Sequence, residues 1–380
     1  MKLSYVTILV TIFVIGMYIG HKNVPNYIYH NYIKNKKNSS ENFLINKIDT
    51  IDFNKKIRIN NMSNLDTLRT KLIKIVWNQN QIPSEIKIDK VIKDSKQKHL
   101  YNKENILGHD IIEIITNEVI KSKIKIFYPK LNKRNEAVIY HNGHGEELVI
   151  QIKCIDRLLK EGFTVIKINM PLHGENGIPT YNFPYMGNIE IKNHDILNYF
   201  PNPYPSYFSP IRASILYVNK KHNINTFHMM GISGGGWTTQ LYAAMDTSIK
   251  RSYAIAGSVP IEYRFLSPYD WGDAEQHDPR IYSNISYPEI YVLGAAGKGR
   301  SQMHILNSYD PCCFQAEAGK YYKKAICEKI NILGEGQFQF LADTTDKSHT
   351  ISDYALEKII QHLNSKYSNH TKHACTSNIW

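Results

Sequence analysis

One segment near the middle of the chain determines the fold that we expect: Phe227-His228-Met229-Met230-Gly231-Ile232-Ser233-Gly234-Gly235-Gly236-Trp237. Its apolar first half predicts a buried strand, and the residues from Trp237 to Met245 predict a helix. The serine between them stands on a sharp turn in a Gly-x-Ser-x-Gly pattern, whose glycines let the strand and the helix pass without a Cβ clash. Ser233 is therefore a candidate nucleophile. The helix that follows it offers free backbone N–H groups to a developing negative charge.

Strands alternate with helices on both sides of this turn. Before it we expect strands at 137–140 and 164–169, and helices at 147–160 and around 211–221. After it we expect strands at 251–257, 289–294 and 337–342. Such alternation predicts a mostly parallel sheet, with sites at the carboxyl ends of its strands.

The region before this alternation has a different pattern. Leu65, Leu68, Leu72 and Val76 recur at helical spacing. Short alternating runs at 110–115 and 124–128 then predict antiparallel strands that begin the sheet.

The stretch from about Leu65 to Ile360 resembles the α/β-hydrolase fold. The resemblance rests on four motifs in order: His141-Asn142-Gly143-His144-Gly145, Pro171-Leu172-His173-Gly174, the turn at 231–235, and Asp346-Lys347-Ser348-His349. It implies an α/β architecture and acyl transfer to water through a serine ester. It does not fix the substrate.

The order nucleophile, acid, histidine in this fold assigns the catalytic candidates. Ser233 would attack the acyl carbon, His349 would act as general base, and Asp310 would orient the histidine. Asp310 lies far beyond the strand expected at 289–294, so an intervening helix has to bring it back. Five other carboxylates are alternatives for the acid: Asp270, Asp273, Asp278, Asp343 and Asp346.

The oxyanion hole would combine the backbone N–H of Gly234 with one from the loop at 141–145. We expect His144 to supply the second donor, with Gly143 and Gly145 as alternatives. The side chains of His141, His144 and His173 are expected to be structural, because their separate loops offer no close-spaced pair of metal ligands. The predicted mechanism requires neither a metal nor an organic cofactor.

Two segments rich in Tyr, Phe, Trp and Pro lie between the predicted elements, at 181–208 and within an insertion at 260–286. Both are candidates for a lid or an acyl-binding wall, although aromatic loops also pack only against themselves.

The N-terminus carries the charge-free run Leu3 to Gly20, flanked by Lys2 and His21-Lys22. Its length favours an uncleaved, single-pass membrane anchor at 1–22 over a cleaved signal that would release a secreted or periplasmic protein. We expect a polar linker at 23–62, the folded domain at 63–366 and a tail at 367–380.

The formal net charge of +12 comes from dispersed lysines, and the chain contains no nucleic-acid-binding module. A basic face toward anionic lipids is more consistent with this distribution. The five cysteines do not have the spacing of a zinc site. A bridge from Cys327 to Cys312 or Cys313 is one expectation, and unpaired buried cysteines are the other.

These patterns together predict a hydrolase that cleaves small-molecule carboxylic esters. The same residues would also suit a serine peptidase or an acyltransferase, and a catalytically inactive binding protein can have the same fold.

Overall fold

The structure is a computed structural model that describes residues 51–93, 104–131, 134–145, 148–264 and 271–366. The chain divides into a first unit, Met1–Ile51, and a second unit, Asp52–Trp380. Every helix and strand of the described residues belongs to the second unit.

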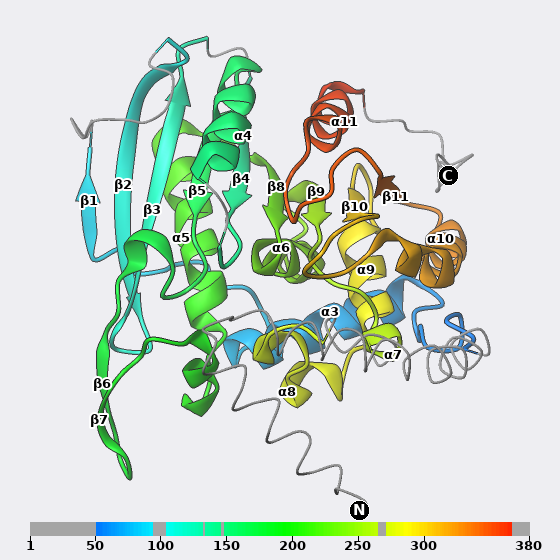
Figure 1. The fold of residues 1–380 in the computed structure, drawn as a ribbon, viewed down its shortest axis with the longest axis horizontal. Coiled ribbons are helices and arrows are strands. Elements are labelled where there is room, and N and C mark those ends of the chain that lie inside the picture. The colour runs from blue at the N-terminus through cyan, green and yellow to red at the C-terminus, as the bar shows by residue number, and fades with distance from the viewer. Residues whose placement is uncertain (1–50, 94–103, 132–133, 146–147, 265–270, 367–380) are drawn as a thin grey trace, which may run out of the picture. The chain divides into compact units, whose positions relative to one another are not determined.

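Within the described residues, the second unit is built on a nine-stranded sheet with the order β1-β2-β3-β5-β4-β8-β9-β10-β11 (Figure 1). Neighbouring strands are antiparallel from β1 through β2 and β3 to β5. They are parallel in the rest of the sheet, from β5 through β4, β8, β9 and β10 to β11. The strands are β1 (Lys90–Ile92), β2 (Ile106–Thr116), β3 (Ile120–Pro129), β4 (Glu136–His141), β5 (Thr164–Ile168), β8 (Thr226–Ile232), β9 (Ile249–Ile255), β10 (Ser301–Asn307) and β11 (Gln337–Asp343). A separate antiparallel hairpin pairs β6 (Thr180–Phe183) with β7 (Gly187–Glu190).

Helices connect the parallel strands. The α-helices are α3 (Met62–Trp77), α4 (Leu148–Lys160), α5 (Pro205–His222), α6 (Gly234–Met245), α7 (Ile261–Arg264), α8 (Pro279–Tyr282), α9 (Tyr287–Ala295), α10 (Gly319–Leu333) and α11 (Asp353–Asn364). Short 3-10 helices are η1 (Gly174–Asn176), η2 (His194–Tyr199), η3 (Ala274–Gln276) and η4 (Ala316–Ala318).

The main core lies between the sheet and helices α4 and α11, which pack on one face (Figure 1). Alternate residues of the central strands, such as Val138 and Tyr140 of β4, join the apolar stripe of α4 in this core. The other face of β4 is buried as well, and a strand buried on both faces needs a nearly continuous apolar sequence. This requirement explains why the central strands were recognisable in the sequence.

Most expected elements are confirmed. The strands expected at 137–140, 164–169, 251–257 and 337–342 correspond to β4, β5, β9 and β11, and the expected helices correspond to α3, α4, α5 and α6. The runs at 110–115 and 124–128 fall in β2 and β3, which pair antiparallel as expected.

The strand expected at 289–294 is wrong, because this segment lies in helix α9. Ser286 caps that helix: its side chain accepts the N–H of Glu289, and the Glu289 side chain accepts the N–H of Ser286. Such a capping box stabilises a helical first turn, so it overrides the strand propensity of a short apolar run. The strand that follows is β10, whose polar residues Gln302, His304 and Asn307 concealed it in the sequence although all three are buried.

The folded domain begins earlier than the Ser63 boundary that we expected. Phe53, Ile57 and Ile59 are buried, and Arg58 makes hydrogen bonds to the buried carboxylate of Glu289. The apolar residues of this segment are too few and too irregularly spaced to show a period. Their burial therefore depends on contacts with distant parts of the chain.

The expected anchor at 1–22, most of the expected linker and the tail at 367–380 lie outside the described residues. Within the described ranges, the helices are too short or too polar to cross a bilayer. The expected bridge from Cys327 to Cys312 or Cys313 is wrong, because Cys312 and Cys313 are bonded to each other. Cys154 is buried and is not in a disulfide.

Candidate active site

Ser233 stands alone between β8, which ends at Ile232, and α6, which begins at Gly234. Its backbone has φ 57° and ψ −126°, a strained combination for a residue with a Cβ atom. The Ser233 N–H donates to the carbonyl of Ile255 on the next strand, at 2.9 Å. A Cβ at Gly231 would lie only 2.3 Å from the carbonyl oxygen of Gly235, so the turn requires glycine there. The sharp strand-to-helix turn expected from the sequence is therefore present.

The loop after β4 lies directly against this serine. A Cβ added to Gly143 would lie 2.8 Å from the Cβ of Ser233. The ring of His144 covers the start of α6, since a Cβ on Gly234 would meet His144 Cε1 at 2.5 Å. Gly234 is the first residue of α6, and its N–H has no acceptor inside the helix. The two predicted oxyanion donors, Gly234 and His144, thus come from segments that touch beside Ser233.

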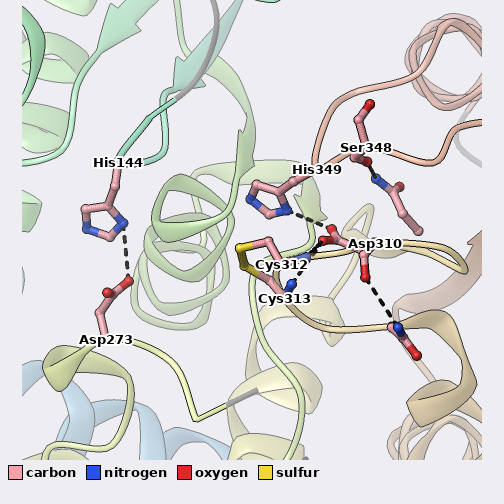
Figure 2. The surroundings of a disulfide bond; sticks show 9 residues. His144, Asp273, Asp310, Cys312, Cys313, Ser348 and His349 are labelled. Carbon is pink, nitrogen blue, oxygen red and sulfur yellow. Dashed lines mark hydrogen bonds and ion pairs between the residues drawn. A yellow bond between two sulfur atoms is a disulfide. The ribbon is translucent and has the colours of Figure 1, made fainter. Parts of the chain in front are cut away.

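His349 and Asp310 are hydrogen-bonded to each other, with His349 Nδ1 2.7 Å from Asp310 Oδ2 (Figure 2). The other carboxylate oxygen, Oδ1, accepts the backbone N–H groups of Cys312 and Cys313 at 2.9 Å each. Asp310 is 1% exposed. Burial opposes its ionisation, but the hydrogen bonds from His349 and from the two backbone amides outweigh burial and lower the pKa of this carboxyl group.

Because an ionised carboxylate only accepts hydrogen bonds, Nδ1 of His349 carries the proton in this pair. In the neutral ring the lone pair is then on Nε2. This atom is buried and has no hydrogen-bond partner among the described residues. The ring nitrogen of His349 without a partner among these residues is therefore the one that faces away from Asp310.

Ser233 and His349 line the same cavity, which has a volume of about 530 Å³. The other lining residues are Gly143, His144, Gly145, Ile232, Ala256, Trp271, Gly272, Asp273, Gln276, Cys312, Cys313 and Phe314. Four of them come from the insertion at 260–286, and the described residues of 181–208 contribute none. The aromatic hairpin region instead packs largely on itself, as in the edge-to-face contact of Tyr181 with Phe183 and its tilted contact with Phe200.

The alternative acids have other partners. Asp343 accepts hydrogen bonds from Thr345 and Ser352, Asp346 accepts from Ser348, and Asp278 binds Arg280 and Tyr204. Asp273 faces His144, and Asp270 lies outside the described residues. Asp310 needs no intervening helix, because it closely follows the end of β10 at Asn307. Our expectation of a long excursion came from the misplaced strand at 289–294.

The expectation that the separate histidine loops offer no close-spaced pair of metal ligands is wrong. The rings of His144 and His194 stack with their centroids 4.3 Å apart, and His173 lies 4.9 Å from His144. Burial, together with the neighbouring imidazoles, lowers the pKa of His144 to about 2, so its ring is neutral near pH 7. His194, Asp273 and Glu275 complete this group, and neither His194 nor Glu275 was among the sequence candidates. The chain positions of these residues are too widely separated to suggest a common site.

Comparisons with known proteins agree with this architecture. A family model described as alpha/beta hydrolase fold matches residues 136–301, which include the Ser233 turn. A comparison with curated sequences finds no match.

Two solved structures share the fold at low sequence identity. Methylesterase BT1017 has a TM-score of 0.57 and 13% identity, over 78% of this chain and 62% of that protein. A candidate acetyl xylan esterase from Bacteroides fragilis has a TM-score of 0.56 and 13% identity, over 80% of this chain and 87% of that protein. The chain therefore has the α/β-hydrolase fold, and residues 136–301 match the family model of that name.

Proposed function

We propose that the protein is a serine hydrolase that cleaves small-molecule carboxylic esters through Ser233, His349 and Asp310. One observation carries the proposal. The Asp310–His349 hydrogen bond leaves Nε2 of the histidine without a partner, in the wall of the cavity that Ser233 also lines. A nucleophile, a base and a group that orients the base are the minimum set for this chemistry.

In the proposed first half-reaction, Oγ of Ser233 attacks the ester carbonyl carbon while Nε2 of His349 takes the hydroxyl proton. The backbone N–H groups of Gly234 and His144 stabilise the negative charge on the carbonyl oxygen. Nε2 then gives its proton to the departing alkoxide, which leaves as an alcohol. The acyl group remains on Ser233 as an ester.

In the second half-reaction a water molecule attacks the acyl-enzyme. His349 takes one proton from that water, and the same backbone donors stabilise the second tetrahedral intermediate. Collapse of this intermediate returns the proton to Ser233 and releases the carboxylic acid. Asp310 stays ionised throughout and stabilises the transient imidazolium.

The cavity supports a small-molecule substrate. Its volume of about 530 Å³ lies within the range of roughly 300–1,000 Å³ that is usual for ligand pockets. Trp271 and Phe314 give it an apolar wall beside the polar groups. The solved proteins with the same fold are described as a methylesterase and a candidate acetyl xylan esterase, which favours ester chemistry for this chain.

The test is turnover of p-nitrophenyl esters by the parent protein and by Ser233→Ala. Loss of the nucleophile should lower kcat by about 10⁴-fold or more. Ser248→Ala, which changes a serine in the turn after α6, is the matched control and should retain parental activity. Parental turnover by Ser233→Ala would refute the proposal. A panel of ester, thioester and peptide substrates should show the highest kcat/KM for esters, whereas a preference for peptides would indicate a peptidase.

We also propose that the charge-free run Leu3 to Gly20 anchors the enzyme to a membrane as a single-pass helix. The support is its length without charge and its flanking lysines, Lys2 and Lys22. The full-length protein should stay in the membrane pellet after carbonate extraction, and a variant without residues 1–22 should be released. Release of both proteins to the same extent would contradict the anchor.

A further inference from the structure

A cluster of imidazole and carboxylate side chains lies beside the cavity, which two of its members, His144 and Asp273, also line. None of the cluster belongs to the proposed triad. His144 lies in the loop after β4, His173 in the loop after β5, and His194 at the start of η2. Asp273 directly precedes η3, and Glu275 lies within it. Potential ligand atoms of His144, His194, Asp273 and Glu275 all lie within 4.8 Å of one another, as do those of the three histidines.

Glu275 is at the centre of this cluster and is 1% exposed. Its Oε2 lies 3.1 Å from Nε2 of His194, and its Oε1 lies 3.7 Å from Nε2 of His144. The second distance is too long for a hydrogen bond. Oε1 of Glu275 and Nε2 of His144 are both buried and have no hydrogen-bond partner among the described residues.

An unpaired carboxylate oxygen that faces an unpaired imidazole nitrogen in a buried site is unfavourable unless something lies between them. Two ligand atoms bound about 2.1 Å from one tetrahedral zinc ion lie roughly 3.4 Å apart. The two observed separations, 3.1 Å and 3.7 Å, bracket that value. A cation at this point would give both unpaired atoms a partner without a large movement.

His144 has a carboxylate beside its second ring nitrogen, as metal-binding histidines commonly do. Oδ2 of Asp273 lies 3.3 Å from Nδ1 of His144, on the side of the ring away from Nε2 (Figure 2). A carboxylate that holds the remote nitrogen of a ligating histidine fixes its tautomer and leaves the other nitrogen free to bind a metal. His173 contributes a further imidazole beside His144 and His194.

We propose that Nε2 of His144, Nε2 of His194 and the carboxylate of Glu275 bind a divalent transition-metal ion, with zinc as the best match. Asp273 orients His144, and His173 lies beside the two ligating imidazoles. Two or three imidazoles with one carboxylate suit zinc and its neighbours in the first transition row. Calcium and magnesium instead prefer oxygen ligands.

The ion would join the loop after β4 to the insertion that carries η3, and would hold both against the cavity. It would thereby fix the backbone of His144, the residue proposed as an oxyanion donor. The metal site does not depend on the serine mechanism, so the two proposals can fail separately.

The test uses the full chain, stripped of metal with a chelator and titrated with Co²⁺ and then Zn²⁺. Co²⁺ should bind at one equivalent per chain and give visible d–d absorption bands of tetrahedral or five-coordinate cobalt, and Zn²⁺ should remove them. Glu275→Gln, which keeps the shape of the side chain, and His194→Ala should each weaken Zn²⁺ binding by on the order of 100-fold or more. Circular dichroism should show that the folds of both variants are retained.

Two controls separate this site from adventitious binding. His222→Ala removes an exposed histidine at the end of α5, beside Tyr128, and should bind Zn²⁺ as the parent does. Ser233→Ala should also keep parental affinity. Absence of the cobalt bands would overturn the proposal. Parental Zn²⁺ affinity in Glu275→Gln would also overturn it, as would an equal loss of Zn²⁺ affinity in His222→Ala and Glu275→Gln. If His194→Ala does not fold, the result for Glu275→Gln decides.

Discussion

Oδ2 of Asp310 lies 2.7 Å from Nδ1 of His349, while Oδ1 of the same carboxylate accepts two backbone N–H groups from Cys312 and Cys313. Both oxygens are thus engaged, and the carboxylate cannot rotate without losing a hydrogen bond. The backbone turn after β10 therefore aims Asp310 at His349. In this arrangement the position of His349, the proposed base, depends on a backbone turn rather than on a flexible side chain.

Asp310→Asn should lower kcat for ester hydrolysis by about 10⁴-fold, because an amide can donate to Nδ1 and stabilise the wrong tautomer of His349. The measurement is kcat and KM with a p-nitrophenyl ester, together with a thermal melt that reports the fold. KM should change much less than kcat.

Asp346→Asn is the matched control for this substitution. Asp346 lies three residues before His349 in sequence but hydrogen-bonds Ser348, and asparagine retains an acceptor for those bonds. Its activity should stay within a few-fold of the parent. If Asp346→Asn lost most of the activity and Asp310→Asn lost little, Asp310 would not be the acid, and our assignment would be wrong.

Gly143→Ala should lower kcat by about 10²–10³-fold, the usual effect of losing one oxyanion donor. The added Cβ would lie 2.8 Å from both the Cβ of Ser233 and the carbonyl oxygen of Ile232, so the loop that carries His144 has to move away. Steady-state kinetics and a thermal melt would measure the effect.

Gly145→Ala is the control that tests whether the loss of kcat in Gly143→Ala comes from the clash with Ser233. A Cβ at Gly145 meets no atom within 4 Å, and the substitution keeps the backbone N–H. This variant should hydrolyse esters at the parental rate. Equal activity of the two alanine variants would show that the loop does not have to lie against Ser233.

Arg58→Ala should lower the free energy of unfolding by about 2 kcal/mol. Glu289 is buried, and Arg58 binds both of its oxygens, so the substitution leaves a buried carboxylate without its cation. The expected loss is below the roughly 3–5 kcal/mol of a fully buried pair, because the guanidinium of Arg58 is half-exposed. Lys55→Ala is the control for this substitution. It removes an exposed ion pair in the same segment and should change the free energy of unfolding by less than about 0.5 kcal/mol. Urea unfolding measures the free energy of unfolding of each variant. Equal stabilities of Arg58→Ala and the parent would contradict the inclusion of 52–61 in the folded domain.

The Arg58–Glu289 pair predicts a dependence of stability on pH. Burial opposes ionisation of Glu289, but hydrogen bonds from Arg58 and Ser286 lower its pKa below the usual 4.5. A lowered folded-state pKa adds stability above the unfolded-state pKa, and this contribution is lost as the pH falls through the folded-state value. The parent should therefore lose this part of its stability only below about pH 4.5. In Arg58→Ala, where burial acts unopposed by the guanidinium, the folded-state pKa of Glu289 should rise, so this acid-induced loss of stability should be smaller than in the parent or absent. Parallel unfolding curves for both proteins between pH 3 and pH 7 would contradict this.

The elements around Ser233 could be predicted because their signals are local. β8 and α6 are buried over almost their whole length and consist mainly of apolar residues, and the glycines between them are required by direct backbone contacts. The placement of Asp310 could be guessed only from chain order. Its strand, β10, carries buried polar residues and resembles a loop in sequence, whereas α9 is apolar enough to resemble a strand. The Ser286 and Glu289 capping pair was the signal that could have corrected this prediction.

The histidine cluster shows what the sequence could not reveal. His144, His194 and Glu275 are widely separated along the chain and come together only through tertiary contacts between segments distant in sequence. Ligand spacing along the sequence detects sites within one turn or helix, but not sites assembled by tertiary contacts. The same limitation applies to Phe53, Ile57 and Ile59, whose burial depends on distant segments.

The most direct test of the serine mechanism is covalent labelling of the intact protein with a fluorophosphonate, followed by peptide mapping by mass spectrometry. We predict one adduct per chain, located on Ser233, lost in Ser233→Ala and strongly slowed in His349→Ala. An unlabelled parent protein, or an adduct on any other serine, would contradict the account.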